Sequence, residues 1–122
     1  MAYSPQVLDH FHHPRHAGAI PGATAIVEVT NPVCGDVLKL WVVVRGGSIR
    51  DVGFQAAGCV PAVACGSWLA EWLEGKEAGQ LPPLSAAEIG SSLGGLPSAS
   101  THAAALAVAA CEELGRAIHP AA

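Results

Sequence analysis

The sequence has few charged residues and no cluster of positive charge. Its 122 residues include six Lys and Arg and ten Asp and Glu, which give a formal net charge of −4. Nucleic-acid phosphates are bound by clustered basic side chains, so we do not expect nucleic acid as a partner. Hydrophobic residues make up 51% of the chain, which indicates a globular protein and argues against a disordered one.

The chain also lacks a long apolar run and a start that looks like a leader. No stretch approaches the roughly 20 apolar residues of a membrane-spanning helix. Met1 is followed by Ala-Tyr-Ser-Pro, not by a basic and then apolar segment. We therefore predict a cytoplasmic protein that does not cross a membrane. The length fits one domain over residues 1–122, without internal repeat or linker.

Periodicity predicts strands in the first half of the chain and helices in the second. A short helix begins at Pro5 after the cap Ser4 and ends before Pro14. Three strands are predicted at 25–29, 37–44 and 49–56, the last two joined by a tight hairpin at 45–48.

Helical spacing of apolar residues then begins at Pro61 and stops at Gly75. A third helix is capped by Ser85 and ends at Gly94, and a fourth runs from about residue 100 or 101 to Ile118. The predicted fold class is α+β, with a three-stranded antiparallel sheet packed against helices in two layers.

Two of the four cysteines lie where thiols can do chemistry. A chain without a leader is expected to keep its cysteines as thiols or metal ligands, because the cytosol is reducing. Cys34 and Asp36 flank Gly35 on a turn, so both side chains can face one ligand. Cys59 precedes a helix that begins near Pro61, and the N–H groups there favour a thiolate with a lowered pKa.

The other two cysteines, Cys65 and Cys111, lie at helical spacing from apolar residues and are expected in the core.

The histidines fall into one tract and one isolated position. His10, His12, His13 and His16 lie on different helix faces, so we predict a solvated polar surface and not a metal tract. His102 stands at the head of the last helix, where a histidine is by itself more often a polar end residue than a ligand.

An ordered set of motifs covers nearly the whole chain. They are Tyr3-Ser4-x-x-Val7-x-Asp9-His10-Phe11-x-x-Pro14-Arg15-x-Ala17-Gly18, Cys34-Gly35-Asp36-x-x-x-Leu40, Gly58-Cys59-x-x-Ala62, Glu71-Trp72-x-x-Gly75-Lys76, Leu93-Gly94-Gly95-Leu96-Pro97 and His102. In order and spacing, this set resembles the NifU/IscU-like iron–sulfur cluster assembly scaffold family, N-terminal domain type.

The resemblance implies an α+β fold with a site at one end of the sheet, built from three loops. It implies that the site holds iron or a transient [2Fe–2S] cluster, whose sulfur comes from a cysteine desulfurase and which passes to apo iron–sulfur proteins. By position, Cys34 and Cys59 are the expected thiolate ligands. Asp36 is the expected weak oxygen ligand that keeps the cluster labile, and His102 an adjacent ligand.

The chain departs from the family pattern in two places. The pattern has His-Cys where this chain has His102-Ala103, so the third ligand cysteine is absent. Neither Cys65 nor Cys111 replaces it by spacing. The Leu-Pro-Pro-x-Lys stretch, which resembles an Hsp70-type chaperone recognition site, reads Leu-Pro-Ser-Ala-Ser at 96–100 and leaves that partner doubtful.

Three functions are compatible with this pattern. The first is a scaffold or carrier that binds iron or a [2Fe–2S] cluster through Cys34, Asp36, Cys59 and His102. The second is a mononuclear metal protein, most simply a zinc protein, because two Cys, one His and one Asp form an acceptable tetrahedral set. The third is a degenerate paralogue that docks on the assembly machinery without metal. No nucleophile and base are arranged for turnover, so we do not expect an enzyme.

Overall fold

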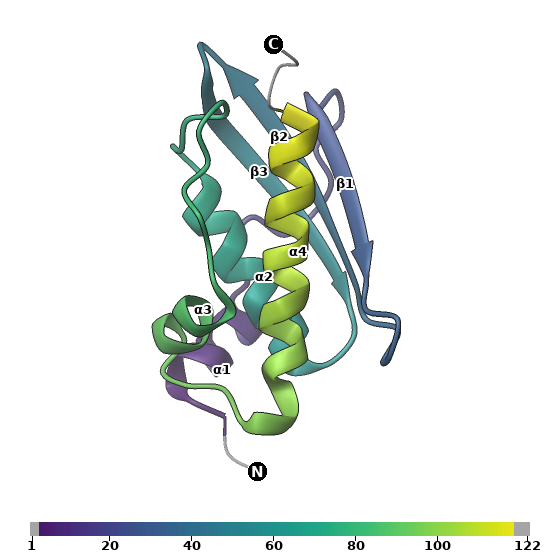
Figure 1. Cartoon of the computed structure of the whole chain (residues 1–122), viewed down its shortest axis with the longest axis vertical. Helices are drawn as coiled ribbons and strands as arrows, with labels where there is room; N and C mark the ends of the chain where they lie inside the picture. Colours follow the sequence, from purple (N-terminus) through teal and green to yellow (C-terminus); the bar gives the residue numbers. More distant parts are fainter. Residues whose placement is uncertain (1–2, 119–122) are drawn as a thin grey trace.

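The structure, a computed structural model, describes residues 3–118. Its helices and strands are α1 (Pro5–His12), β1 (Ala25–Thr30), β2 (Val37–Arg45), β3 (Ser48–Ala57), α2 (Val60–Leu73), α3 (Ala86–Ser92) and α4 (Thr101–Ile118), with a 3₁₀ turn at Ser98–Ser100. Figure 1 shows α2 and α4 lying side by side across one face of the sheet. The predicted α+β fold is confirmed, and the element boundaries agree with the sequence-based ranges within about a residue or two.

The three strands form one antiparallel sheet in the order β1-β2-β3. The hairpin between β2 and β3 is closed by Gly46 and Gly47, whose φ angles are 60° and 79°. Two successive residues with positive φ match the tight turn whose twist suits antiparallel strands, as the glycine pair predicts. Register then places Leu40 opposite Phe54 and Val42 opposite Val52, so that buried side chains share one face.

The helical layer covers this buried face. Helix α2 packs against β3, and α4 packs against β1 and β2. Gly66 allows the close approach of α2, because a Cβ there would lie 2.9 Å from the Phe54 ring and 3.0 Å from the Leu38 side chain. Leu69 and Leu114 are fully buried between the layers. Within residues 3–118, no helix has both the length and the hydropathy needed to cross a membrane.

Three chain segments meet at one end of the sheet. Thr30 pairs with Val37, and Val37 pairs with Ala57, so the β1–β2 loop and the β3–α2 junction leave the sheet at the same edge. The head of α4 lies at that end too, in the lower part of Figure 1. The antiparallel connections and the packing of α4 therefore bring together residues 31–36, 58–59 and 101–102, which are far apart along the chain.

Candidate metal centre

The first two predicted ligands lie on the β1–β2 loop. Gly35 has a φ of 79°, a conformation that L side chains rarely adopt, and it separates Cys34 from Asp36. The side chain of Cys34 is exposed, whereas Asp36 is buried. The turn therefore gives the two neighbouring ligands different environments, one at the rim and one inside.

The third predicted ligand is Cys59, the residue immediately before α2. It is half-buried, and its Sγ lies 3.3 Å from Oδ2 of Asp36, to which the thiol donates a hydrogen bond. The same Sγ lies 3.7 Å from Nε2 of His102. Cys59 thus joins the loop carboxylate to the histidine of a helix 43 residues further along the chain.

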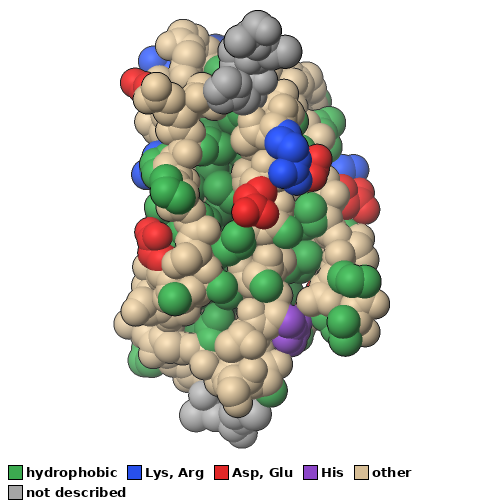
Figure 2. All heavy atoms as spheres, in the orientation of Figure 1, with side chains coloured by type: hydrophobic (Ala, Val, Ile, Leu, Met, Phe, Trp, Pro, Cys, Tyr) green, Lys and Arg blue, Asp and Glu red, His purple; other side chains and the backbone are tan. Residues whose placement is uncertain are grey.

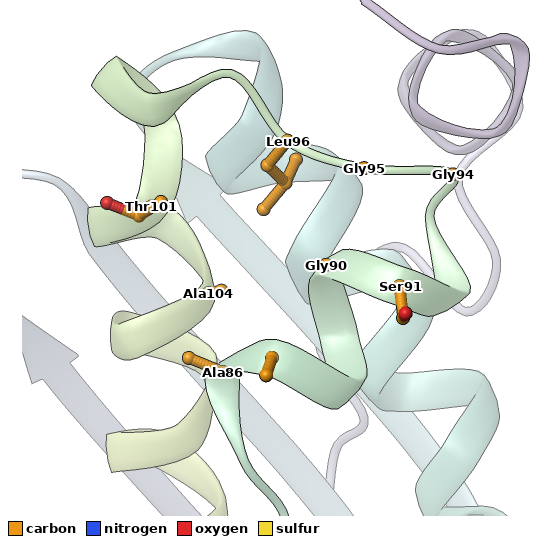
Figure 3. Close-up of a pocket in the computed structure, with 9 residues that line it drawn as sticks. Ala86, Gly90, Ser91, Gly94, Gly95, Leu96, Thr101 and Ala104 are labelled. Carbon is orange, nitrogen blue, oxygen red and sulfur yellow. The ribbon is translucent and has the colours of Figure 1, made fainter.

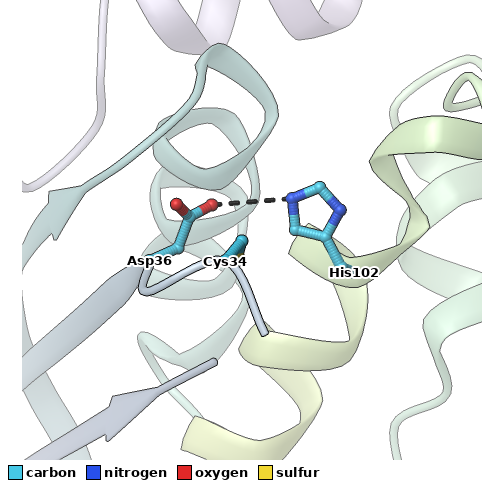
Figure 4. Close-up of side chains that lie close together, drawn as sticks. All are labelled: Cys34, Asp36 and His102. Atoms are coloured by element: carbon cyan, nitrogen blue, oxygen red, sulfur yellow. Dashed lines mark ion pairs between the residues drawn. The ribbon is translucent and has the colours of Figure 1, made fainter. Parts of the chain in front are cut away.

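His102, the second residue of α4, completes the group. Its Nε2 lies 3.6 Å from Oδ2 of Asp36, and about one third of its side chain is exposed. Ligand atoms of Cys34, Asp36 and His102 all lie within 4.8 Å of one another, and Figure 4 shows the three side chains converging. The structure therefore brings all four predicted site residues together. We call these four side chains the ligand cluster.

Gly58 makes room for the buried carboxylate in this cluster. A Cβ at Gly58 would lie 2.5 Å from the carboxyl carbon of Asp36 and 2.5 Å from its Oδ1, closer than real contacts allow. The carboxyl group is therefore seated against the backbone of the residue that precedes Cys59. Reasoning from sequence gave this glycine no role, and its position directly before a ligand cysteine is the only local sign of one.

The separations of three ligand atoms match those around a single metal ion. Sγ of Cys59, Oδ2 of Asp36 and Nε2 of His102 form a triangle with sides of 3.3, 3.6 and 3.7 Å. A tetrahedral ion bound at about 2.0–2.3 Å holds its ligands about 3.3–3.8 Å apart. The cluster is thus arranged for one ion before any rearrangement, with the exposed Cys34 nearby as a further thiolate.

Comparison with known proteins agrees with this fold. A model of the family described as NifU-like N terminal domain matches residues 2–119. The chain belongs to this family. It is 38% identical over 105 residues to iron–sulfur cluster assembly scaffold protein IscU 1 of Archaeoglobus fulgidus, covering 86% of this chain and 69% of that protein.

A second relative and a solved structure extend the comparison. The NifU-like chain is 36% identical over 111 residues to iron–sulfur cluster assembly scaffold protein IscU of Escherichia coli, covering 88% of this chain and 86% of that one. The crystal structure of a nitrogen-fixing NifU-like protein (N-terminal) from Brucella abortus superposes with a TM-score of 0.74. The superposition covers 97% of this chain and 94% of the Brucella abortus chain. Because the two sequences are only 15% identical, this similarity supports the fold alone.

The thiol pKa of Cys59 in this NifU-like chain differs from the prediction. Burial raises the pKa above its ordinary value, and the neighbouring carboxylate of Asp36 raises it further. The backbone N–H of Ala62 at the start of α2 acts in the opposite direction but does not compensate. The predicted lowering is therefore wrong, and a cation bound by Cys59 would have to displace the thiol proton.

The core cysteines are where the sequence predicted them. Cys65 on α2 and Cys111 on α4 are both buried. Burial raises the pKa of Cys65 to about 12 and that of Cys111 to about 11. Both are packed into the core and lie outside the ligand cluster. Ala103, next to His102, is likewise buried, and its side chain belongs to the hydrophobic core.

The N-terminal histidines are only partly on the predicted polar surface. His12 and His13 are exposed, but the prediction is wrong for His10, which is buried with Nδ1 2.8 Å from Oγ of Ser67. Burial lowers the pKa of His10. The error arose because the partner of His10 lies 57 residues away and cannot be found from local pattern.

His16 is half-buried and stands beside two carboxylates. Its Nε2 lies 3.7 Å from Oε1 of Glu74, and the ligand atoms of His16, Asp51 and Glu74 lie within 4.8 Å of one another. Both carboxylates are exposed, and exposed carboxylates often gather without an ion, so this group is a surface charge cluster.

A separate pocket of about 510 Å³ lies beside the head of α4, against α3 (Figure 3). No ionisable side chain and no ligand-cluster residue lines it. The face of the molecule in Figure 2 carries only scattered charged side chains. This pocket therefore offers none of the side chains that usually bind a metal ion. The pocket is lined by Ala86, Ala87, Gly90, Ser91, Gly94, Gly95, Leu96, Thr101 and Ala104.

Proposed function

We propose that this NifU-like chain is a scaffold on which an iron–sulfur cluster is assembled and from which it is transferred. Support comes from its family and from relatives named as iron–sulfur cluster assembly scaffold proteins. The observation that carries the proposal at residue level is the convergence of Cys34, Asp36, Cys59 and His102 from three separate segments of the chain. In this proposal iron or a [2Fe–2S] cluster is the cargo.

The chemistry of the donor set suits a cargo that must leave again. Thiolates of Cys34 and Cys59 are soft ligands of the kind that iron–sulfur clusters prefer, and imidazole can replace a thiolate on iron. The carboxylate of Asp36 is a harder, weaker ligand for such a cluster. With Ala103 in place of a third cysteine, the site offers two thiolates, so we expect it to hold a cluster more loosely than a three-thiolate site.

Burial divides the roles within the ligand cluster. Asp36 is buried and fixed between Gly58 and Cys59, so it anchors the site from the inside. Cys34 is exposed at the rim, where an incoming sulfur donor or an acceptor protein can reach it. This arrangement allows the cargo to be exchanged from the open side, where Cys34 lies.

The scaffold role implies partners and a location. We propose that a cysteine desulfurase supplies the sulfur, that apo iron–sulfur proteins accept the cluster, and that the chain acts in the cytoplasm as one scaffold domain over residues 1–122. An Hsp70-type chaperone is not included, because residues 96–100 lack the lysine of the resembling recognition stretch. The residues bind and orient the cargo, and we assign none of them a catalytic turnover.

A second function, the binding of a single zinc ion, is favoured by one specific observation. The triangle of Cys59, Asp36 and His102 has the dimensions of three corners of a tetrahedral site, as given above. A two-iron cluster is wider than one ion and requires the ligands to spread. A closed zinc site would stabilise the fold instead of exchanging its metal.

Anaerobic purification separates the two functions. We expect iron and inorganic sulfide in equal amounts, with charge-transfer absorption in the visible range, whereas zinc would give a colourless protein with one metal per chain. Cys59→Ser is expected to abolish either form of binding, because it removes the thiolate at the centre of the ligand cluster.

Cys111→Ala is the matched control, since it removes a cysteine that lies in the core, and it is expected to keep the metal content of the parent protein. Full metal content in Cys59→Ser would contradict the assignment of the site.

A further inference from the structure

One residue makes most of the hydrogen bonds that shape the loop carrying Cys34 and Asp36. Asn31 is the first residue after β1, and its backbone N–H donates to the carbonyl of Asp36 at 2.8 Å. Its carbonyl accepts from the N–H of Gly35, also at 2.8 Å. These two bonds close the loop across its base, so that the six residues 31–36 form a compact turn.

The side chain of Asn31 adds a second set of bonds inside the turn. Its Oδ1 accepts from the N–H of Val33 at 2.9 Å and from the N–H of Cys34 at 3.4 Å. Asn31 is half-buried, whereas the side chains of Val33 and Cys34 are exposed. Because an exposed side chain is held by few neighbours, the direction of the Cys34 thiol depends on the backbone that this amide oxygen fixes.

We propose that Asn31 is a positioning residue that orders the exposed ligand Cys34 toward Asp36 and His102. This inference rests on the proposed function. It adds to the site a residue that positions a ligand but does not itself contact the iron or the cluster. Its amide oxygen keeps the Cys34 backbone in one conformation before metal arrives, so less conformational freedom is lost on binding. Groups that orient metal ligands in this way commonly contribute a factor of about 10–100 to metal affinity.

The hydrogen-bond pattern makes the role specific to the side chain. An acceptor oxygen on the γ carbon is required at position 31, which Asn and Asp both supply. Asn31→Ala removes the two bonds to Val33 and Cys34 but leaves both backbone bonds across the base of the loop. Asn31→Asp keeps the acceptor and serves as the conservative rescue.

The first test measures the loop without metal. Amide hydrogen exchange of Val33 and Cys34 is followed by NMR in the parent protein, Asn31→Ala and Asn31→Asp. We expect exchange at these two amides to be about tenfold faster in Asn31→Ala and unchanged in Asn31→Asp, because only the alanine variant loses the acceptor. Unchanged exchange in Asn31→Ala would overturn the inference.

The second test measures binding with Co²⁺ as the probe metal, through its thiolate absorption bands. We expect Asn31→Ala to lower Co²⁺ affinity about tenfold and Asn31→Asp to bind at least as tightly as the parent protein. The matched control is Thr24→Ala, which removes a 2.9 Å bond from the N–H of Val44 to Oγ1 at the opposite end of the sheet. Equal losses in Asn31→Ala and Thr24→Ala would overturn the inference in favour of general loosening.

The two tests distinguish failure of the inference from failure of the proposed function. If the parent protein binds neither Co²⁺ nor iron, the metal function is wrong, while the exchange rates still decide whether Asn31 orders the loop. If the parent protein binds metal and Asn31→Ala binds it equally well, the metal function stands and the positioning role is wrong.

Discussion

The four cysteines fall into two pairs with different environments: Cys65 and Cys111 are buried in the core, whereas Cys34 and Cys59 belong to the ligand cluster. Cys65 and Cys111 lie in helix interiors with their side chains in the core, and burial raises the pKa of the Cys65 thiol to about 12 and that of the Cys111 thiol to about 11. Cys34 and Cys59 lie where strands give way to loops, beside a carboxylate and an imidazole. Position at the end of an element, and not the residue type, places a cysteine beside other potential metal ligands.

The strongest difference between the pairs is expected in thiol reactivity. At pH 8 a thiol with a pKa of about 12 is ionised in roughly one molecule in ten thousand, so the buried Cys65 is expected to react with iodoacetamide at least about 1000-fold more slowly than the exposed Cys34. Cys59 is expected to fall between them, because its pKa is raised and it is half-buried. Mass spectrometry of digested protein after timed labelling measures the rates.

The pH dependence of labelling sharpens this result. Because the pKa of Cys59 is raised, its thiolate fraction keeps increasing by about tenfold per pH unit beyond the ordinary thiol value. In urea all four cysteines are expected to react alike. Equal labelling of Cys65 and Cys34 in the native protein would show that the core opens under these conditions. It would contradict the proposed difference in reactivity between the buried and the exposed cysteines.

The second prediction concerns stability. Cys65→Ser places a hydroxyl in a fully buried apolar position and is expected to lower the free energy of unfolding by about 1–3 kcal/mol. Cys34→Ser changes an exposed loop side chain and is expected to alter it by less than about 0.5 kcal/mol. Urea denaturation followed by circular dichroism compares the two. A larger loss in Cys34→Ser than in Cys65→Ser would reverse the assignment of core and site.

The smallest effect is expected from restoring a thiol to the site. Ala103→Cys adds a third thiolate beside His102, and we expect the lifetime of a reconstituted cluster to increase by about threefold to tenfold. Ala103 is 1% exposed and its side chain packs in the hydrophobic core, so the added sulfur reaches the ligand cluster only if the head of α4 adjusts. The decay of visible absorption under chelator measures the lifetime.

Ala105→Cys on the same helix is the control, because Ala105 is exposed and its thiol would face solvent. An unchanged lifetime in Ala103→Cys would mean that a thiol at position 103 does not reach the bound iron–sulfur cluster.

Local chemistry allowed much of the fold to be predicted. Ser4 caps α1 by accepting the N–H of Val7, and Ser85 caps α3 by accepting the N–H of Glu88, as their positions in the sequence predict. The pair Gly46-Gly47 forms the predicted hairpin. In each case the deciding interaction joins residues no more than four positions apart, so it can be predicted from the neighbouring sequence.

The residues predicted for the site lie together in the structure, whereas the direction of the Cys59 pKa shift was predicted wrongly. Resemblance to a family named Cys34, Asp36, Cys59 and His102, and the structure places them together. The raised pKa of Cys59 could not be read from its position before a helix, because the decisive factors are burial and Asp36, which is 23 residues distant. The roles of Gly58 and Asn31 also emerged only from contacts with the ligand loop.

By itself, the sequence determined the order of strands and helices, the caps and turn that separate them, and the residues capable of holding metal. These follow from periodicity, short-range hydrogen bonds and the chemistry of side chains. Only the tertiary structure decided which of those residues meet, which are buried and how far apart their ligand atoms lie. The physical reason is that antiparallel pairing and helix packing bring three distant loops to one edge of the sheet, where desolvation and neighbouring charge depend on long-range contacts.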